Sequence, residues 1–265
     1  MSDVFVESIG LAAPGLADWN VGRAVLRGET DYDRAPLSSY APTLLPANEA
    51  RRATATVRLA FRVAEEAIKR AECPGDSVAT VFASSDADMT VSHRICTALS
   101  QAQRLVSPTD FHNSVHNAPS GYWHIGAHSQ LPSSAVAAHD YSFATGLLET
   151  MTQVQAERRP TLLVCYDVPA PEPLLRSRPL AAPFAVALLL TAQRSERSLA
   201  GIHIESLTAE SSATTLASKE LDTLRFGNPA GRALPLLDAI ANGVNRSITL
   251  ERSAQRPMTL KVSVI

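Results

Sequence analysis

The sequence predicts an α/β fold, and two patterns support this prediction. Short, continuously apolar runs at 77–85, 161–168 and 184–192 have the length and composition of strands that are buried on both faces. Elsewhere, apolar residues recur three and four positions apart, most clearly over 48–71, as they do in amphipathic helices. Strands that alternate with such helices are typical of a sheet covered by helices.

The composition fits one globular domain that meets other proteins. A chain of 265 residues with 45% hydrophobic residues can bury a full core, and we expect a single domain over 1–265. The net charge of −2 and the pI near 6.4 provide no broad basic field. Nucleic acid and anionic membranes are therefore not expected as partners.

The cysteines and the apolar runs favour a cytoplasmic protein. Cys73, Cys96 and Cys165 show no CxxC spacing, so neither a disulfide framework nor a thiolate zinc site is predicted. The N-terminus carries acids where a secretory signal would carry Lys or Arg. The apolar run at 184–192 is about half of the ~20 residues that a membrane-spanning helix needs, so no membrane insertion is expected.

The first part of the chain predicts two strands and three helices. A strand is expected over 3–13 and a short helix near 21–27. The clearest helix opens at Asn48, which we expect to be its N-cap, and ends before a Pro-Gly pair. A strand follows over 77–85, and a helix over 89–102 is expected to turn its apolar residues inward. These inward residues are Ile95, Leu99 and Ala102.

The middle of the chain predicts a strand, a helix and another strand. Residues 132–138 are small, which suggests that something packs very close to this strand. A helix follows from about Ser142, and 161–168 is a buried strand. The apolar stripe of this helix consists of Phe143, Leu147, Met151 and Val154.

The last third predicts three strands and a helix. The runs 184–192 and 202–209 are expected to be neighbouring strands joined by a hairpin loop at 194–200. The final strand, 258–265, alternates apolar and polar residues, so one of its faces should be wet. The helix before it is predicted from Leu234, Leu237, Ile240 and Val244.

Four of the seven histidines lie in one segment, "TDFHNSVHNAPSGYWHIGAHS". His112 and His116 are four residues apart, and so are His124 and His128. Zinc sites use this spacing on one helix, but they add a carboxylate or a third histidine, and Pro119–Gly121 separates the two pairs. Hydrogen-bonded or exposed histidines are the more common case, so no metal is predicted.

The sequence also offers hydroxyl nucleophiles, without a motif that selects one. Ser114, Ser120 and Ser142 are present, but no GxSxG elbow occurs. Neither GxGxxG nor a Walker lysine is found, so no cofactor is predicted. Asp86 and Asp88 in "SSDAD" could hold a divalent ion, but this run at a strand end is also ordinary turn chemistry, which is the more common case. An acyl hydrolase or acyltransferase that uses Ser142 with a histidine of the 112–139 cluster remains an alternative.

Four segments, taken in their order along the chain, resemble a known family. They are TVFASSDADMTVSHRICTAL, SPTDFHNSVHNAPSGYW, SSAVAAHDYSFATGLLE and LLVCYDVP. Together they resemble the N-terminal half of β-ketoacyl synthases, most closely the short ketosynthase-like chain-length factors of bacterial aryl polyene and xanthomonadin-type pigment clusters. The likeness covers about 1–210 and implies a thiolase-like, layered α-β-α fold with a mixed sheet. Residues 211–265 would add a C-terminal helix and an edge strand.

The chain departs from active ketosynthases at the nucleophile. In those enzymes the small-residue strand ends in a Thr-Ala-Cys-type elbow, where the dipole of the next helix lowers the thiol pKa. Here His139 and Asp140 occupy the elbow, and no cysteine is present in it. Active ketosynthases also carry two histidines in their C-terminal half, whereas only His203 follows residue 139. The resemblance therefore implies no independent condensing activity.

The resemblance implies instead a non-catalytic partner subunit. Such a subunit would form a heterodimer with an active β-ketoacyl synthase, stabilise it and help to bound the tunnel in which a polyene chain grows on an acyl carrier protein. The small-residue strand would pair across the dimer axis, and the histidine-rich segment would form interface and tunnel wall. Phe111 and Trp123 could alternatively be plain core residues. The residues expected at the interface or tunnel are Phe111, His112, His116, Asn117, Tyr122 and Trp123.

Overall fold

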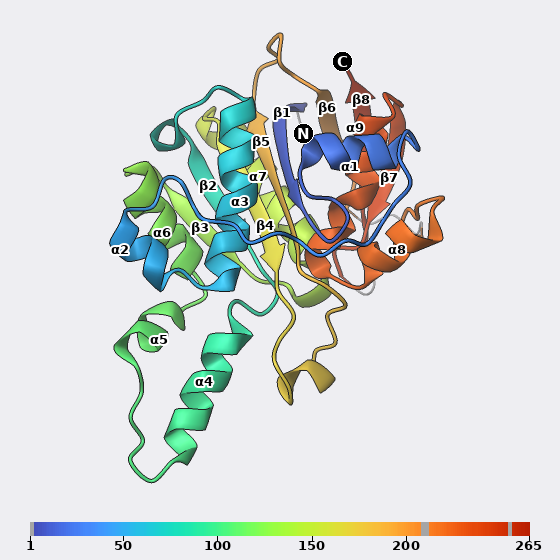
Figure 1. Ribbon diagram of the computed structural model, residues 1–265. Helices are drawn as coiled ribbons and strands as arrows, with labels where there is room; N and C mark the ends of the chain where they lie inside the picture. Colours follow the sequence, from blue (N-terminus) through green and yellow to red (C-terminus); the bar gives the residue numbers. More distant parts are fainter. Residues whose placement is uncertain (1–2, 208–211, 254–255) are drawn as a thin grey trace.

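The computed structural model describes residues 3–207, 212–253 and 256–265, and its strands form one mixed sheet (Figure 1). The order of the eight strands in this part of the chain is β3-β2-β4-β5-β1-β6-β8-β7. β2 pairs in parallel with β3 and β4, and the other neighbours are antiparallel. The strands are β1 (Val4–Ala12), β2 (Ala79–Ala83), β3 (Ser133–Val136), β4 (Thr161–Asp167), β5 (Phe184–Thr191), β6 (Ala200–Ser206), β7 (Arg246–Leu250) and β8 (Met258–Val264).

Helices cover both faces of the sheet, so the layered α-β-α arrangement is confirmed (Figure 1). α3 and α6 pack on one face, and α7, α9 and α1 belong to the core on the other face. None of the helices in the described ranges is long and apolar enough to cross a bilayer. The helices are α1 (Trp19–Leu26), α2 (Ala47–Arg52), α3 (Ala55–Arg70), α4 (Met89–Ser100), α5 (Pro108–Asn113), α6 (Ala118–Ala127), α7 (Ser142–Glu157), α8 (Lys219–Phe226) and α9 (Leu234–Ala241).

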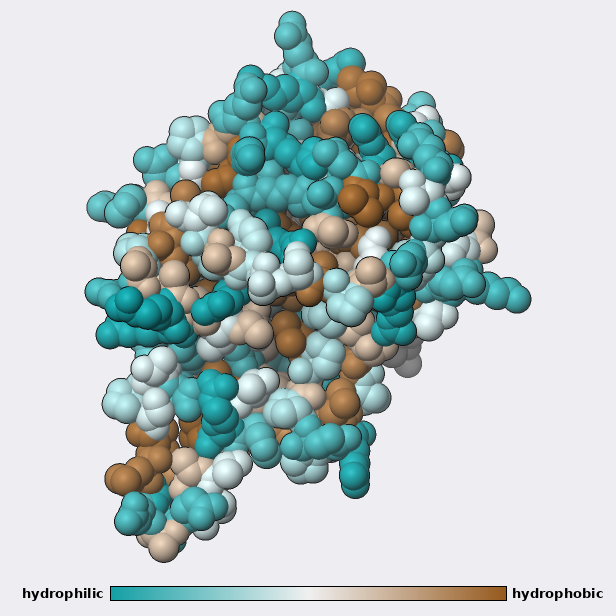
Figure 2. All heavy atoms as spheres, in the orientation of Figure 1, coloured by the Kyte–Doolittle hydropathy of each residue, from teal (hydrophilic) through white to brown (hydrophobic). Residues whose placement is uncertain are grey.

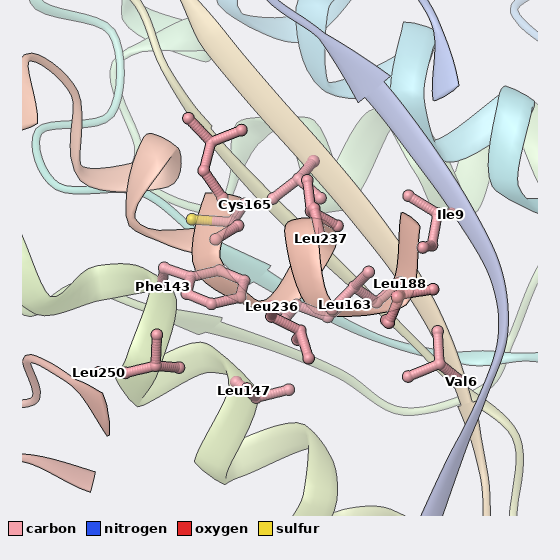
Figure 3. Packing of buried hydrophobic residues seen from close by; sticks show 14 of the residues in the cluster. Val6, Ile9, Phe143, Leu147, Leu163, Cys165, Leu188, Leu236, Leu237 and Leu250 are labelled. Carbon is pink, nitrogen blue, oxygen red and sulfur yellow. The ribbon is translucent and has the colours of Figure 1, made fainter. Parts of the chain in front are cut away.

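The predicted apolar stripe of α7 is confirmed, because all four of its residues are fully buried. Figure 3 shows Phe143 and Leu147 on this helix beside Leu236, with Leu163 and Leu188 of the sheet close by. Burying one such side chain stabilises the fold by about 1.5–3 kcal/mol. The packing of α7 on the sheet therefore fixes the position of its N-terminus.

Two adjacent carboxylates on α3 hold the proline-rich connection between β1 and α2. Glu65 is buried and accepts hydrogen bonds from the N–H groups of Thr43 and Leu44, at 2.9 and 3.0 Å. Glu66 accepts a hydrogen bond from the N–H of Trp19 at 2.8 Å. These carboxylates satisfy backbone groups that have no partner in a helix or strand, and so they order the connection.

The helix predicted to open at Asn48 is two helices, so that prediction was wrong. α2 starts without a side-chain cap, and Asn48 instead accepts a hydrogen bond from Arg51. Ala53 is extended, and α3 begins after Thr54, whose hydroxyl accepts the Val57 N–H at 3.3 Å. The apolar residues keep their helical spacing across the break at Ala53, so the sequence pattern did not reveal Thr54 as the N-cap of α3.

The predicted hairpin of β5 and β6 was wrong, because β1 lies between these strands and pairs with both. The strand predicted at 202–209 ends at Ser206, and residues 208 and 209 lie outside the described residues. Neighbouring strands in sequence are commonly neighbours in a sheet, and the N-terminal strand overrides that tendency here.

The C-terminal strand, β8, is flanked by β6 and β7, so its predicted place at the edge was wrong. Its alternation is confirmed, since Leu260 and Val262 are buried and Lys261 between them is exposed. Val244, which was predicted in the last helix, lies beyond the end of α9 and is 45% exposed.

α4 and α5 stand out from the body of the molecule (Figure 1). We call residues 87–117, which contain both helices, the arm. α4 buries only Val91, and the predicted inward face was wrong: Leu99 is 49% exposed and Ala102 is exposed beyond the helix end. The apolar residues of α4 do recur at helical spacing, but the helix packs chiefly on α5, and Leu99 stays exposed.

Gly10 lies where β1 crosses α3, and we expect Gly10→Ala to destabilise the protein. A Cβ atom at this position would lie 2.0 Å from the carbonyl oxygen of Val63, so strand and helix must move apart. The expected loss in the free energy of unfolding is about 3 kcal/mol. Gly121→Ala is the matched control, because a Cβ there meets nothing within 4 Å and the helical site should gain up to about 1 kcal/mol. Urea unfolding measures both, and equal effects would contradict the close approach.

Candidate functional site

The chain turns sharply at the elbow between β3 and α7. His139 has a φ of 52°, in the left-handed region that residues other than glycine seldom adopt. Ser142 supports this turn, because its hydroxyl accepts the Ala138 N–H at 3.1 Å and donates to the His139 carbonyl at 2.8 Å. The His139 side chain is directed outward and is 65% exposed. The elbow is thus a strained turn at the N-terminus of α7.

A row of charged side chains links the elbow to the carboxyl end of the sheet. Arg178 donates to Asp140 at 2.6 Å and to Asp86 at 2.8 Å. Its side chain is 15% exposed, so solvent screens these charge-assisted bonds little. The Nδ1 atom of His139 lies 3.5 Å from the second oxygen of Asp140. Arg178 therefore ties the loop after β4 to the elbow.

Asp167, the last residue of β4, organises the root of the arm. Its Oδ1 atom accepts the hydroxyl of Ser84 at 2.9 Å and both the N–H and the hydroxyl of Ser85 at 2.8 Å. Burial raises the pKa of Asp167 to about 7; the hydrogen bonds from both serines lower it in part, and Asp86 raises it. His116, at the C-terminal end of the arm, lies beside the segment that precedes the arm: its Nε2 atom is 3.1 Å from the Ser84 carbonyl oxygen.

The six residues predicted at an interface or tunnel fall into two groups. Phe111 is 71% exposed, and His112 and Asn117 are exposed as well, while His116 is half-buried against Ser84. Tyr122 and Trp123 are core residues of α6, at 1% and 0% exposure. Trp123 packs against Phe61 of α3, and Tyr122 lies edge-on to His112, so both rings are covered by the chain itself and a partner surface can rest only on the first four residues.

The histidine pairs do not form ligand pairs. His116 follows the end of α5 and so does not share a helix with His112. His124 lies in α6, whereas His128 is its left-handed cap with a φ of 54°. Across residues 3–207, 212–253 and 256–265, no group of three or more His, Cys, Asp or Glu side chains could hold a metal ion.

β3 forms an outer edge of the sheet, as the expected pairing of the small-residue strand across a dimer axis requires. The carbonyl groups of Pro132 and Val136 accept hydrogen bonds from the β2 side, at 3.1 Å each. Because backbone groups alternate along a strand, the N–H and C=O groups of Ser133 and Ala135 point away from β2. In the described part of the chain, no backbone group pairs with them. Ala135 is also exposed, so this edge is open.

The opposite edge of the sheet, β7, is covered at Thr249. Thr214 donates its N–H to the carbonyl of Thr249 in β7 at 2.9 Å, and its hydroxyl accepts the Thr249 N–H at 2.9 Å. A covered edge is the usual protection against pairing with another chain. The sheet thus offers β3 as a strand to which another chain could add.

The family of the chain follows from its sequence and agrees with this geometry. The model described as "Beta-ketoacyl synthase, N-terminal domain" matches residues 28–234. The chain belongs to this family. No curated protein matches the sequence.

Solved structures with the same fold include complexes of ketosynthases. The ketosynthase ApeO in complex with its chain length factor ApeC, from Xenorhabdus doucetiae, matches with a TM-score of 0.73 and 25% identity over 98% of this chain and 100% of that chain. The ishigamide ketosynthase/chain length factor matches with a TM-score of 0.75 and 11% identity, covering 100% of both chains. A type II PKS acyl-carrier protein in complex with its ketosynthase matches with a TM-score of 0.75 and 10% identity, over 100% of this chain and 99% of that chain.

These likenesses confirm the ketosynthase-type fold and the resemblance to ketosynthase/chain length factor structures. The second and third matches, at 11% and 10% identity, show only that the fold is the same.

The buried Asp167 predicts a pH dependence of stability. Its pKa of about 7 lies above the ordinary value of 3.8, so between these values the folded protein binds one proton more than the unfolded chain. The free energy of unfolding should therefore fall as the pH rises from about 4 to 7, by on the order of 4 kcal/mol from this group. Asp167→Asn cannot ionise and should lose this part of the dependence. Urea unfolding at pH 5 and pH 8 compares the two proteins, and an equal loss in both would show that Asp167 is not the source.

Proposed function

We propose that this chain is a non-catalytic, chain-length-factor-like subunit that forms a cytoplasmic heterodimer with an active β-ketoacyl synthase. In that complex it stabilises the ketosynthase and helps to bound the tunnel in which a polyene chain grows on an acyl carrier protein. The observation that carries the proposal is the elbow: it keeps the strained turn at the start of α7, with His139 at a φ of 52°, but it has no thiol. Without a thiol at this place, the chain cannot form the thioester by which a ketosynthase cysteine accepts and passes on an acyl chain.

The cysteine that shares a buried cluster with α7 does not replace the missing nucleophile. Cys165 lies in β4 and is fully buried, and burial raises the pKa of its thiol well above the ordinary value. A thiol without thiolate character and without access is not a nucleophile. The chemistry of condensation would therefore belong to the partner.

The open edge of β3 supports the heterodimer. Its outward backbone groups at Ser133 and Ala135 can accept a strand from a second chain, which is a recurring mode of association. The ApeO structure, which this chain matches, is of a ketosynthase in complex with its chain length factor, the same kind of pair.

The alternative of an acyl hydrolase or acyltransferase at Ser142 has less support. Ser142 is fully buried, and both hydrogen bonds of its hydroxyl are used inside the elbow, to Ala138 and His139 backbone groups. A nucleophilic serine needs access to substrate and an imidazole in contact with its hydroxyl. The geometry of Ser142 suits a structural role in the turn.

We expect the chain to co-purify with the β-ketoacyl synthase encoded in its own gene cluster, and Ala135→Pro to abolish this. The substitution removes an N–H that points away from β2, so the fold should survive while strand addition is lost. Ala135→Ser keeps the N–H and serves as the control. Affinity purification of the tagged chain after co-expression measures the complex. If wild type brings down no ketosynthase, and the ketosynthase alone is active with unchanged product length, the proposal fails.

A further inference from the structure

Two buried arginines lie against the exposed ring of Phe226 at the end of α8. The guanidinium carbon of Arg225 is 3.9 Å from the ring centroid, and that of Arg232, in the 3₁₀ turn η4 (Pro229–Ala233), is 4.9 Å away. The two arginine side chains are 2% and 11% exposed, whereas Phe226 is 53% exposed. Figure 2 shows mainly hydrophilic residues at the right of the molecule, where α8 lies. We call Arg225 and Arg232 the arginine pair.

The carboxylates beside the arginine pair satisfy only part of its donors. Arg225 donates from Nε to Asp222 at 2.7 Å, and its Nη1 atom lies 3.7 Å from Glu251. The same Glu251 also pairs with Arg232. Among the described residues, no group accepts a hydrogen bond from Nη2 of Arg225 or from Nε of Arg232, although both atoms are buried. One carboxylate thus serves two guanidinium groups, and buried charged donors remain unused.

A third arginine adds to the positive charge of this region. Arg252 follows Glu251 in the chain and donates to the Leu207 carbonyl at 3.2 Å. Its Nε atom is buried and has no acceptor in the part of the chain that the structure describes. Three guanidinium groups therefore stand beside two carboxylates, those of Asp222 and Glu251, and the excess charge is positive.

The arginine pair lies beside the elbow. η4 packs on α7 and on the turn His139–Tyr141. Burial lowers the pKa of Arg232, the charge of Arg225 lowers it further, and Asp140 of the elbow raises it. Buried like charges are costly unless an anion neutralises them and accepts their hydrogen bonds.

The chemistry of the arginine pair and of the ring selects a class of ligand. Guanidinium groups present their N–H donors in a planar fork that matches the oxygens of phosphate and carboxylate. A phosphate monoester has three terminal oxygens and can accept from two separate guanidinium groups at once. The exposed face of Phe226 can contact an apolar or aromatic group next to the phosphate.

We propose that Arg225, Arg232 and Phe226 form a binding site for an organic phosphate ester. The guanidinium groups hold the phosphate, and the phenyl ring contacts the organic part at the surface. The inference does not depend on the proposed heterodimer, because all three residues belong to this chain.

The test measures the binding of phenyl phosphate to the purified full-length chain by isothermal titration calorimetry. Arg232→Gln should weaken binding about tenfold, because a charged hydrogen bond to the phosphate is lost. Phe226→Ala should weaken the binding of phenyl phosphate and leave that of inorganic phosphate unchanged. Arg246→Gln is the matched control: Arg246 pairs with Asp238, also has an unpartnered Nε atom, and lies at the other end of β7 from Glu251.

Glu251→Gln distinguishes a ligand site from a purely structural ion-pair network. Glu251 competes with a bound phosphate for both guanidinium groups and is 29% exposed, so its replacement should tighten phenyl phosphate binding. A structural network would lose thermal stability without any gain in affinity. This measurement stands even if Arg232→Gln fails to fold.

Four results would overturn the proposal. They are no binding of phenyl phosphate by wild type, equal affinity in wild type and folded Arg232→Gln, unchanged affinity in Glu251→Gln, and tighter binding of benzoate than of phenyl phosphate. Equal affinities of wild type for inorganic phosphate and phenyl phosphate would overturn the contact of the organic part with Phe226.

Discussion

The hydrogen bonds of the Asp167 side chain are the interaction on which the positions of the arm and the elbow depend. This carboxylate sits at the carboxyl end of the central strand β4 and binds Ser84 and Ser85 through one oxygen. That turn is the root of the arm. Asp86, which follows Ser85, accepts a hydrogen bond from Arg178, and Arg178 also donates to Asp140 of the elbow. A single buried acid thus connects the arm and the elbow to the rigid sheet, and its burial keeps it from ionising until the pH reaches about 7.

The elbow has the backbone turn that would present a nucleophile, but it lacks the nucleophile. Its strained backbone, the hydroxyl of Ser142 that supports it and the packing of α7 are those of a turn that presents a side chain outward. The side chain presented is His139, which offers a base and no thiol. Strain of this kind normally costs about 1–3 kcal/mol and persists where the surroundings impose it. A chain with this turn and without the nucleophile fits a subunit that acts by binding a partner.

The residue patterns predicted the local elements and the resemblance predicted the layered fold, but neither predicted the order of the strands in the sheet. The buried strand at 161–168, the stripe of α7 and the elbow at His139 and Asp140 are set by neighbours along the chain. The insertion of β1 between β5 and β6 and the open edge of β3 depend on pairings far apart in sequence. Leu99 shows a further limit, because apolar spacing marks a face of a helix without saying what covers it. Arg178 stands in a proline-rich loop with no local pattern that would have selected it.

Hydrogen–deuterium exchange of the chain, alone and with the purified ketosynthase subunit, tests the central claim most directly. The amides of Ser133 and Ala135 have no partner in the described part of the free chain and should exchange fast. On adding the ketosynthase, peptides covering 133–136 should become strongly protected, whereas β7, whose edge Thr214 already covers, should not change. Unchanged exchange at 133–136 in a mixture that contains the complex would contradict strand addition at β3.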